Sequence, residues 1–288
     1  MSGAHVRAAQ SQHVFRLIER DPMHYVIIGG TQLCVSRLAF GTASLHHLIS
    51  ARERSNLLHT ALECGITHFD SSPFYGFGLA EVDLGAFSTC RREAVSIATK
   101  VGLYPRGWYA KHSFDVLLRK GIGKIFRAIS KPQVEWSVRS ADKSLSLSLA
   151  RLRSDYVDIL YLHEPDASLI NLDEFRRWGE RVVSAGKVRY LGLAGPPQPF
   201  SEWLNLTDSF GSIIQAQDSF PNSEADLVLR SGRTLQFTYG YIRSHGGAQN
   251  VDNALNTVGR ALVRNSTGSV LVSTRKAVRV KELTGLFS

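Results

Sequence analysis

Apolar residues along the chain gather in short runs that alternate with stretches of helical periodicity, and these two patterns distinguish strands from helices. The apolar runs predict a strand ending at Asp70 and seven others, at residues 38–43, 95–100, 156–163, 188–194, 212–215, 235–239 and 269–272. Helical periodicity lies between most of them, at residues 51–64, 80–87, 138–152 and 251–264, and in a segment that Asp173 can cap and Gly186 can end. This alternation, with right-handed crossovers, predicts an α/β fold, a parallel (β/α)8 or TIM barrel.

A short hairpin is expected before the barrel. Residues 25–28 and 33–35 are apolar and flank Gly29-Gly30-Thr31-Gln32, a sequence typical of a tight turn between antiparallel strands. No linker rich in proline, glycine or serine divides the remainder of the chain. We therefore expect an N-terminal tail at 1–22 and a single barrel domain at 23–288.

Length and composition are those of a globular protein with a sizeable core. The chain has 288 residues, of which 43% are hydrophobic. It has no run of about 18 apolar residues, so no membrane partner is expected. The N-terminus lacks the apolar segment of a secretory signal, and Cys34, Cys64 and Cys90 lack metal-ligand spacing. We therefore expect free thiols, no metal site and a cytoplasmic location.

The net charge is positive but dispersed. Lys and Arg number 34 against 25 acidic residues, a formal charge of +9 that suits an anionic cofactor, a nucleic acid or solubility alone. Basic residues are concentrated only at 111–131, and the sequence has no concentrated basic and aromatic face, so no nucleic-acid partner is expected. That stretch lies within 101–133, which is too long for an ordinary connection and is typical of a lid or a pocket wall.

Four residues with useful chemistry stand at strand ends or just beyond them. Asp70 ends the second strand, within Phe69-Asp70-Ser71-Ser72-Pro73-Phe74-Tyr75-Gly76, so Tyr75 follows it closely. Lys100 and His163 end the third and fourth strands. Because the carboxyl ends of parallel barrel strands converge on one face, the four side chains are predicted to meet there.

Together these side chains suit proton transfer to a carbonyl oxygen. An ammonium group at Lys100 is expected to lower the pKa of Tyr75 from its usual value of about 10. Asp70 can keep a buried Lys100 charged, and the imidazole of His163 can donate a hydrogen bond to a substrate carbonyl. None of the four can donate hydride, so a nicotinamide cofactor would have to supply it.

The sequence resembles the aldo-keto reductases over residues 29–283. The resemblance rests on Gly41-Thr42-Ala43, Phe69-Asp70 with Tyr75-Gly76 and Glu81, Thr99-Lys100, Ser148-Leu149-Ala150-Arg151-Leu152 with Asp155-Tyr156-Val157-Asp158, His163, and Gly186-Lys187-Val188-Arg189. It implies an oxidoreductase that transfers hydride between NADP(H) and an aldehyde, ketone or sugar. The implied catalytic residues are Asp70, Tyr75, Lys100 and His163, with Tyr75 as the general acid. Some similar barrels are NADP-binding subunits of ion channels, so a redox-sensing module with little turnover is the alternative.

The same resemblance implies contacts to a nicotinamide cofactor. They are Gly41, Thr42, Ala43, Asp70, Gln215, Tyr239, Ser244, Ser273, Thr274, Arg275, Arg279 and Glu282. Gln215 matches the residue that binds the nicotinamide amide, Tyr239 the aromatic residue that stacks on the ring, and Ser244 a pyrophosphate contact. Ala194-Gly195 stand where the family has a serine and an asparagine, so two side-chain contacts to the carboxamide are absent.

The adenosine end of the cofactor is matched after the last strand. Ser273, Thr274 and Arg279 correspond to positions that hold the 2'-phosphate, and Glu282 corresponds to an adenine contact. Arg275 and Lys276 lie alongside in sequence, and three cations near one phosphate favour NADP over NAD, although NAD is possible.

The substrate pocket is expected beside Tyr75 and His163. Its candidate wall residues are Trp108, Tyr109 and Trp136, from the long segment after the third strand and its flank. The expected partner is a small carbonyl compound or sugar, bound by a monomer or weak homo-oligomer. The sequence leaves the substrate and the physiological direction open.

Overall fold

The computed structural model describes residues 25–105, 132–206, 209–244 and 251–287. Its centre is a closed barrel in which every neighbouring pair of strands is parallel, in the order β10-β11-β12-β3-β4-β5-β8-β9. The strands are β3 (Leu38–Gly41), β4 (His68–Asp70), β5 (Ser96–Val101), β8 (Val157–His163), β9 (Val188–Gly195), β10 (Ile213–Gln217), β11 (Phe237–Tyr239) and β12 (Ser269–Val272). The predicted (β/α)8 barrel is confirmed.

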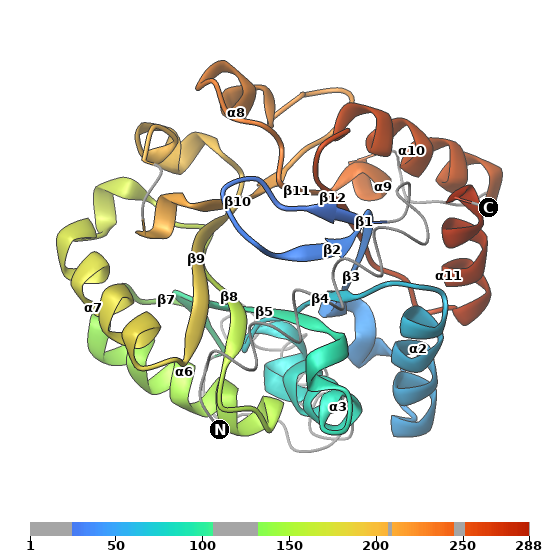
Figure 1. Cartoon of the computed structure of the whole chain (residues 1–288), viewed down its shortest axis with the longest axis horizontal. Helices are drawn as coiled ribbons and strands as arrows, with labels where there is room; N and C mark the ends of the chain where they lie inside the picture. The colour runs from blue at the N-terminus through green and yellow to red at the C-terminus, as the bar shows by residue number, and fades with distance from the viewer. Residues whose placement is uncertain (1–24, 106–131, 207–208, 245–250, 288) are drawn as a thin grey trace, which may run out of the picture.

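Helices surround the barrel and cover the outer faces of its strands (Figure 1). They are α2 (Ala51–Glu63), α3 (Leu79–Ser88), α6 (Val138–Leu152), α7 (Leu172–Ser184), α8 (Asp226–Arg230), α9 (Tyr241–Ser244), α10 (Val251–Arg264) and α11 (Ala277–Thr284). Short 3-10 segments connect them, namely η1 (Thr42–His47), η2 (Tyr75–Gly78), η3 (Arg92–Ala94), η4 (Ala167–Leu169), η5 (Gln198–Trp203), η6 (Ser209–Gly211) and η7 (Gly285–Phe287). No helix in the described ranges is long and apolar enough to cross a membrane.

The predicted hairpin is present. β1 (Tyr25–Ile27) pairs antiparallel with β2 (Cys34–Ser36), and Figure 1 shows this ribbon over the centre of the ring of strands. Ile28, Leu33 and Val35 are buried in one cluster with residues of the barrel interior. The hairpin therefore closes the amino-terminal end of the barrel with apolar side chains, and the opposite end is left for the site.

One helix begins differently from the prediction. The side chain that caps α7 belongs to Asn171, which accepts a hydrogen bond from the backbone N–H of Glu174, whereas Asp173 lies in the first turn. Asp173 still stands at the positive end of the helix dipole, where a carboxylate is favourable. The predicted cap was wrong because both residues are good N-caps and the chain turns before Leu172.

His68 is a fully buried polar group inside the barrel. Its Nδ1 lies 2.9 Å from Ser96 Oγ, and its ring packs 4.7 Å from the ring of Phe237. Burial, helped by the positive charge of Lys100, lowers the pKa of His68 to about 3. The imidazole is therefore neutral in the native protein at every pH of practical interest.

We expect acid to destabilise the protein through His68. Between the native pKa of about 3 and the unfolded value of about 6.5, the unfolded state binds one more proton, so the free energy of unfolding falls as the pH falls. The loss is about 1.4 kcal/mol per pH unit, or about 2 kcal/mol down to about pH 5. Chemical denaturation of the wild type and of His68→Gln at about pH 7 and pH 5 measures this loss. The difference in free energy of unfolding between the two proteins should be about 2 kcal/mol smaller at pH 5 than at pH 7. A gap that is the same at both pH values would contradict the assignment.

Gly85 sets how closely α3 packs on α6. A Cβ atom at this position would lie 2.3 Å from the carbonyl oxygen of Arg151 and 2.7 Å from the Cα atom of Leu152, both backbone atoms that cannot swing aside. By contrast, a Cβ at Gly259 in α10 would have no atom within 4 Å. The two glycines therefore provide a matched pair in helices.

We predict opposite effects for the two substitutions. Gly85→Ala should lower the free energy of unfolding by about 1–3 kcal/mol, because the methyl group forces the helices apart. Gly259→Ala should raise it by about 1 kcal/mol, because alanine is the better helix former and meets no obstacle. Urea denaturation of the three proteins measures both effects, and a stable Gly85→Ala variant would show that α3 and α6 can separate freely.

Candidate active site

The strand ends place the predicted catalytic residues on one rim of the barrel. Asp70 is the last residue of β4 and His163 the last of β8, whereas Lys100 is the penultimate residue of β5. Asp70, Lys100 and His163 are buried, and Tyr75, at the start of η2, is half-buried. Although these residues come from three successive barrel strands, β4, β5 and β8, and from the loop after β4, parallel pairing brings them together at the carboxyl-terminal face.

Lys100 is the centre of the polar network. Its Nζ lies 2.7 and 2.6 Å from the two carboxylate oxygens of Asp70, donates to the backbone oxygen of Ser71 at 2.8 Å, and lies 3.3 Å from the hydroxyl of Tyr75. Burial lowers the pKa of Lys100, and the carboxylate of Asp70 opposes that effect. The ion pair therefore keeps an ammonium group against the phenol in a place where water is excluded.

The loop that presents Tyr75 is tightly turned. Gly76 and Phe77 have φ values of +59° and +56°, and a Cβ at Gly76 would lie 2.5 Å from the Cβ of His46. Only glycine fits at this contact, because both the positive φ and the lack of space disfavour any side chain. The turn directs the ring of Tyr75 toward Lys100 Nζ, at 4.8 Å, and toward the edge of His163, at 6.0 Å between ring centroids.

The predicted lowering of the Tyr75 pKa was wrong. Burial raises the pKa of Tyr75 well above its ordinary value of 10, and the carboxylates of Asp70 and Glu164 raise it further. The expectation counted the ammonium of Lys100 but not its pairing with Asp70, which cancels most of that charge at the phenol. Tyr75 is therefore held in its protonated form, ready to donate.

His163 is a neutral imidazole in the same network. Burial and the positive charge of Lys100 lower its pKa well below the ordinary value of 6.5. Its Nδ1 lies 3.3 Å from Ser72 Oγ, which also accepts a hydrogen bond from the backbone N–H of Phe74. Sequence reasoning gave Ser72 no role, although its hydroxyl stands within the run that follows β4. Ser72 fixes the orientation of the His163 ring relative to the Tyr75 loop.

Gln215 joins the network from β10. Its side-chain N–H donates to Asp70 Oδ1 at 2.8 Å, and the residue is buried. Thr42 lies on the other side of the strand end, where its hydroxyl donates to the backbone oxygen of Asp70 at 3.0 Å. Two of the expected cofactor contacts therefore also hold the Asp70 segment in place.

Other expected cofactor residues line the rim nearby. Ser273, just after β12, donates to the backbone oxygen of Gly41 at 2.8 Å and lies 2.8 Å from the hydroxyl of Ser44, a residue that sequence reasoning missed. Ala43 is exposed beside them, and Tyr239 ends β11. Ser244 ends α9, and its side chain lies outside the described part of the chain.

Basic side chains gather where α11 begins. Arg275 and Lys276 are exposed, and Arg279 lies 3.3 Å from Glu282 through an ion pair on the helix. Thr274 accepts a hydrogen bond from the backbone N–H of Lys276. The structure thus places three cations near the positive end of a helix dipole, an arrangement suited to an anionic group.

Of the three residues predicted to form the pocket wall, the structure describes only Trp136. Trp108 and Tyr109 lie outside the described residues, as does the basic stretch 111–131, so the predicted lid is not described. Trp136 packs on Phe175 of α7, with ring centroids 6.2 Å apart, and against Gly102, where a Cβ would lie 2.1 Å from the indole. Its ring therefore lies beside the end of β5. The two-stranded pair of β6 (Leu103–Tyr104) and β7 (Gln133–Val134) joins the two ends of the long segment.

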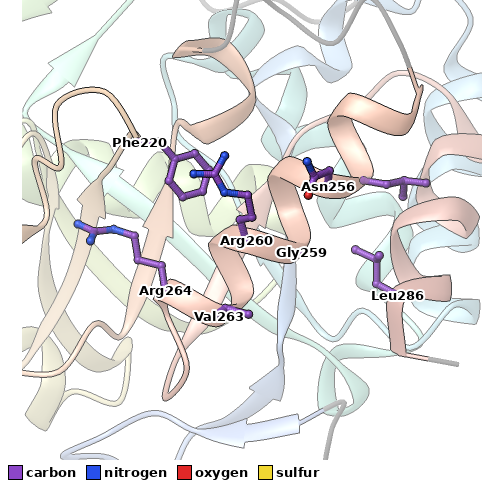
Figure 2. Close-up of a pocket in the computed structure, with 8 residues that line it drawn as sticks. Phe220, Asn256, Gly259, Arg260, Val263, Arg264 and Leu286 are labelled. Atoms are coloured by element: carbon purple, nitrogen blue, oxygen red, sulfur yellow. The ribbon is translucent and has the colours of Figure 1, made fainter.

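A separate concavity of about 790 Å³ lies on the outside of the barrel, between α10 and the C-terminal η7 (Figure 2). Arg260 covers the ring of Phe220 there, with its guanidinium carbon 4.1 Å from the ring centroid. Val263 and Leu286 add apolar surface, and Arg264 is tied to Asp218 at the end of β10. None of the predicted catalytic residues lines this groove.

Comparisons with known proteins agree with the fold and the motifs. Residues 37–207 match the model of the aldo/keto reductase family. The chain is 28% identical over 234 residues to L-galactose dehydrogenase of Arabidopsis thaliana, covering 76% of this chain and 61% of that protein. It is 29% identical over 211 residues to D-threo-aldose 1-dehydrogenase of a Pseudomonas species, covering 70% and 58%. The chain thus spans about three fifths of the length of these curated relatives.

A solved structure shows the same fold. The holo form of an aldo-keto reductase from Bacillus halodurans superposes with a TM-score of 0.71 at 20% identity, covering 91% of this chain and 90% of that one. The family model spans more than half of the present chain, and Asp70, Lys100 and His163, on which the sequence resemblance partly rests, lie at or next to strand ends. The chain belongs to the aldo/keto reductase family.

Proposed function

We propose that the protein is an oxidoreductase that transfers hydride between NADP(H) and the carbonyl or hydroxyl carbon of an aldehyde, ketone or sugar. The observation that carries this proposal is the position of Lys100, which lies within hydrogen-bond distance of both Asp70 and the Tyr75 hydroxyl. A half-buried phenol beside an ammonium group is a proton donor whose anion is stabilised once the proton has left.

In the direction of reduction, each residue has a distinct role. A bound nicotinamide cofactor supplies the hydride to the carbonyl carbon. Tyr75 gives its proton to the oxygen that becomes the alcohol, and the phenolate that remains is stabilised by Lys100. His163 is neutral, so it can donate a hydrogen bond to the substrate oxygen without competing as an acid. In the oxidative direction the same steps run in reverse: Tyr75 must first lose its proton, and the phenolate, stabilised by Lys100, then takes the proton of the substrate hydroxyl.

Sugars are the substrate class that the relatives favour. Both of the reported relatives carry the names of sugar dehydrogenases. The Tyr75 mechanism serves any carbonyl that can reach the phenol, so the chemistry of the rim decides which substrates are preferred.

NADP is the proposed cofactor because of the charge at the start of α11. Arg275, Lys276 and Arg279 supply three cations to one end of the rim, and a 2'-phosphate is the group that distinguishes NADP from NAD. The Gly41 and Ser273 contacts place this region next to the catalytic strand ends. NAD lacks this phosphate, so these cations would not favour its binding.

Cofactor selectivity is expected to depend on Arg279. Tryptophan fluorescence titration should show tighter binding of NADPH than of NADH, and Arg279→Ala should weaken NADPH binding by about 10- to 100-fold while leaving NADH unchanged. Lys281→Ala is the matched control, since a residue two positions along a helix points to nearly the opposite side. Equal affinities for the two cofactors in the wild type would contradict the NADP assignment.

Turnover is expected to depend on the Tyr75 hydroxyl. Tyr75→Phe should lower kcat by about 10²- to 10⁴-fold, because the proton donor is gone, and should leave the Kd for NADPH within about twofold. Tyr190→Phe is the control, because it removes a hydroxyl that contacts the backbone of Gln32 at the hairpin end of the barrel. Stopped-flow or steady-state absorbance at the NADPH band measures the rates.

The same measurement separates the alternative function. A redox-sensing module would bind NADPH but reduce no aldehyde in the wild type, so Tyr75→Phe would change nothing. Turnover by the wild type that survives in Tyr75→Phe would instead show that another group donates the proton.

A further inference from the structure

Glu164, the residue after His163, has a backbone conformation that nothing in the local secondary structure explains. Its φ is +50°, in the left-handed region that costs a residue with a Cβ about 1–2 kcal/mol. Of the other three described non-glycine residues with positive φ, Arg153 is the C-cap of α6, Phe77 belongs to the Tyr75 turn, and Ser223 lies in the loop between β10 and α8. Glu164 neither caps a helix nor forms part of that turn. Strained residues of this kind cluster at functional sites.

The structure holds Glu164 in this conformation from two sides. Its backbone N–H donates to the carbonyl oxygen of Ala194 at 2.6 Å, which ties it to the end of β9. A Cβ at Gly195 would lie 2.9 Å from the Cα atom of Glu164 and 3.2 Å from its Cγ atom. Gly195 itself has a φ of +151°. The side chain of Glu164 therefore passes over Gly195, where a larger residue would occupy the space that it needs.

The carboxylate of Glu164 is exposed at the rim. Within the described ranges it has no hydrogen bond and no ion pair, whereas the carboxylates of Asp70 and Glu81 are paired with Lys100 and Arg151. Glu164 is near enough to act electrostatically on Tyr75 and Lys100, whose pKa values it raises. The catalytic network is thus bordered by a negative charge that forms no ion pair within the described ranges.

We infer that Glu164 is a specificity-determining residue that accepts hydrogen bonds from the hydroxyl groups of neutral polyhydroxy substrates and excludes substrates that carry a carboxylate or phosphate. This inference rests on the proposed function and names the substrate class of the same site. A carboxylate with free oxygens can accept from two neighbouring hydroxyl groups at once, and it repels an anion held at the same distance. Specificity gained in this way combines an attractive contact with a repulsive one.

The charge test uses two aldehydes of the same shape, 4-carboxybenzaldehyde and 4-carbamoylbenzaldehyde, reduced with NADPH. The wild type should prefer the neutral amide, and Glu164→Gln should raise the ratio of kcat/KM for the acid over the amide by about tenfold, since one unit charge at the rim is removed. Glu180→Gln, which removes an exposed carboxylate on the outer helix α7, should leave the ratio unchanged.

The hydroxyl test compares glyceraldehyde with propanal, which has the same carbon chain without hydroxyl groups. Glu164→Met keeps the length of the side chain and removes its acceptors, so the preference for glyceraldehyde should fall by about fivefold or more. Unchanged ratios in both variants, or ratios that stay constant while the Kd for NADPH changes, would overturn the inference. In the latter case, the carboxylate faces the cofactor.

Failure of the proposed function looks different. If the wild type reduces none of the four aldehydes and oxidises no sugar with either cofactor, the oxidoreductase proposal fails, and the role of Glu164 fails with it. If the wild type turns them over and the Glu164 variants retain its ratios, only the role of Glu164 is wrong. Circular dichroism of both variants shows that any change does not come from unfolding.

Discussion

The buried ion pair between Lys100 and Asp70 is the interaction on which the rest of the site depends. Two charges with almost no exposure are stable only if each is fully compensated, and here the carboxylate is bound through both oxygens. Loss of either partner would leave the other charged and buried, at a cost of several kcal/mol. The closed barrel makes the pair possible, because parallel register fixes β4 beside β5 and leaves neither side chain free to turn toward water.

Around this pair, the polar groups of neighbouring strand ends reinforce one another. Gln215 donates to Asp70 from across the barrel, and Thr42 holds the backbone of the same residue. Ser72 connects the Tyr75 loop to His163. A buried network of this kind is favourable only when its members are satisfied together, so it specifies one geometry for the phenol. The apolar hairpin covers the amino-terminal end of the barrel, opposite the site, so water cannot reach the network through that end.

Much of this arrangement could be predicted from sequence, because strand ends are local features. Apolar runs that stop at Asp70 and near Lys100 and His163 locate the rim without any knowledge of long-range contacts. The pKa of Tyr75 could not be predicted, since it depends on which carboxylates surround a charge that is itself paired. The residue that caps α7 depends on where the chain turns. The role of Ser72 depends on its contact with His163, which lies ninety-one positions away in sequence. Such details depend on contacts between residues far apart in sequence, and local sequence patterns do not specify those contacts.

The rim has opposite charges at its two ends, and this polarity gives the site a direction. The exposed cations Arg275 and Lys276 stand at the start of α11, beside Ser273 and β3, whereas the carboxylate of Glu164, which has no ion-pair partner among the described residues, stands beyond His163 and β9. Between them, the Lys100 and Asp70 charges cancel, so the centre is close to neutral. A molecule with phosphates at one end and a neutral reacting group at the other fits this field in one orientation only. In the proposed reaction, the same field would disfavour an anionic second reactant at the Glu164 end, so orientation of the cofactor and selection of the substrate would have one electrostatic origin.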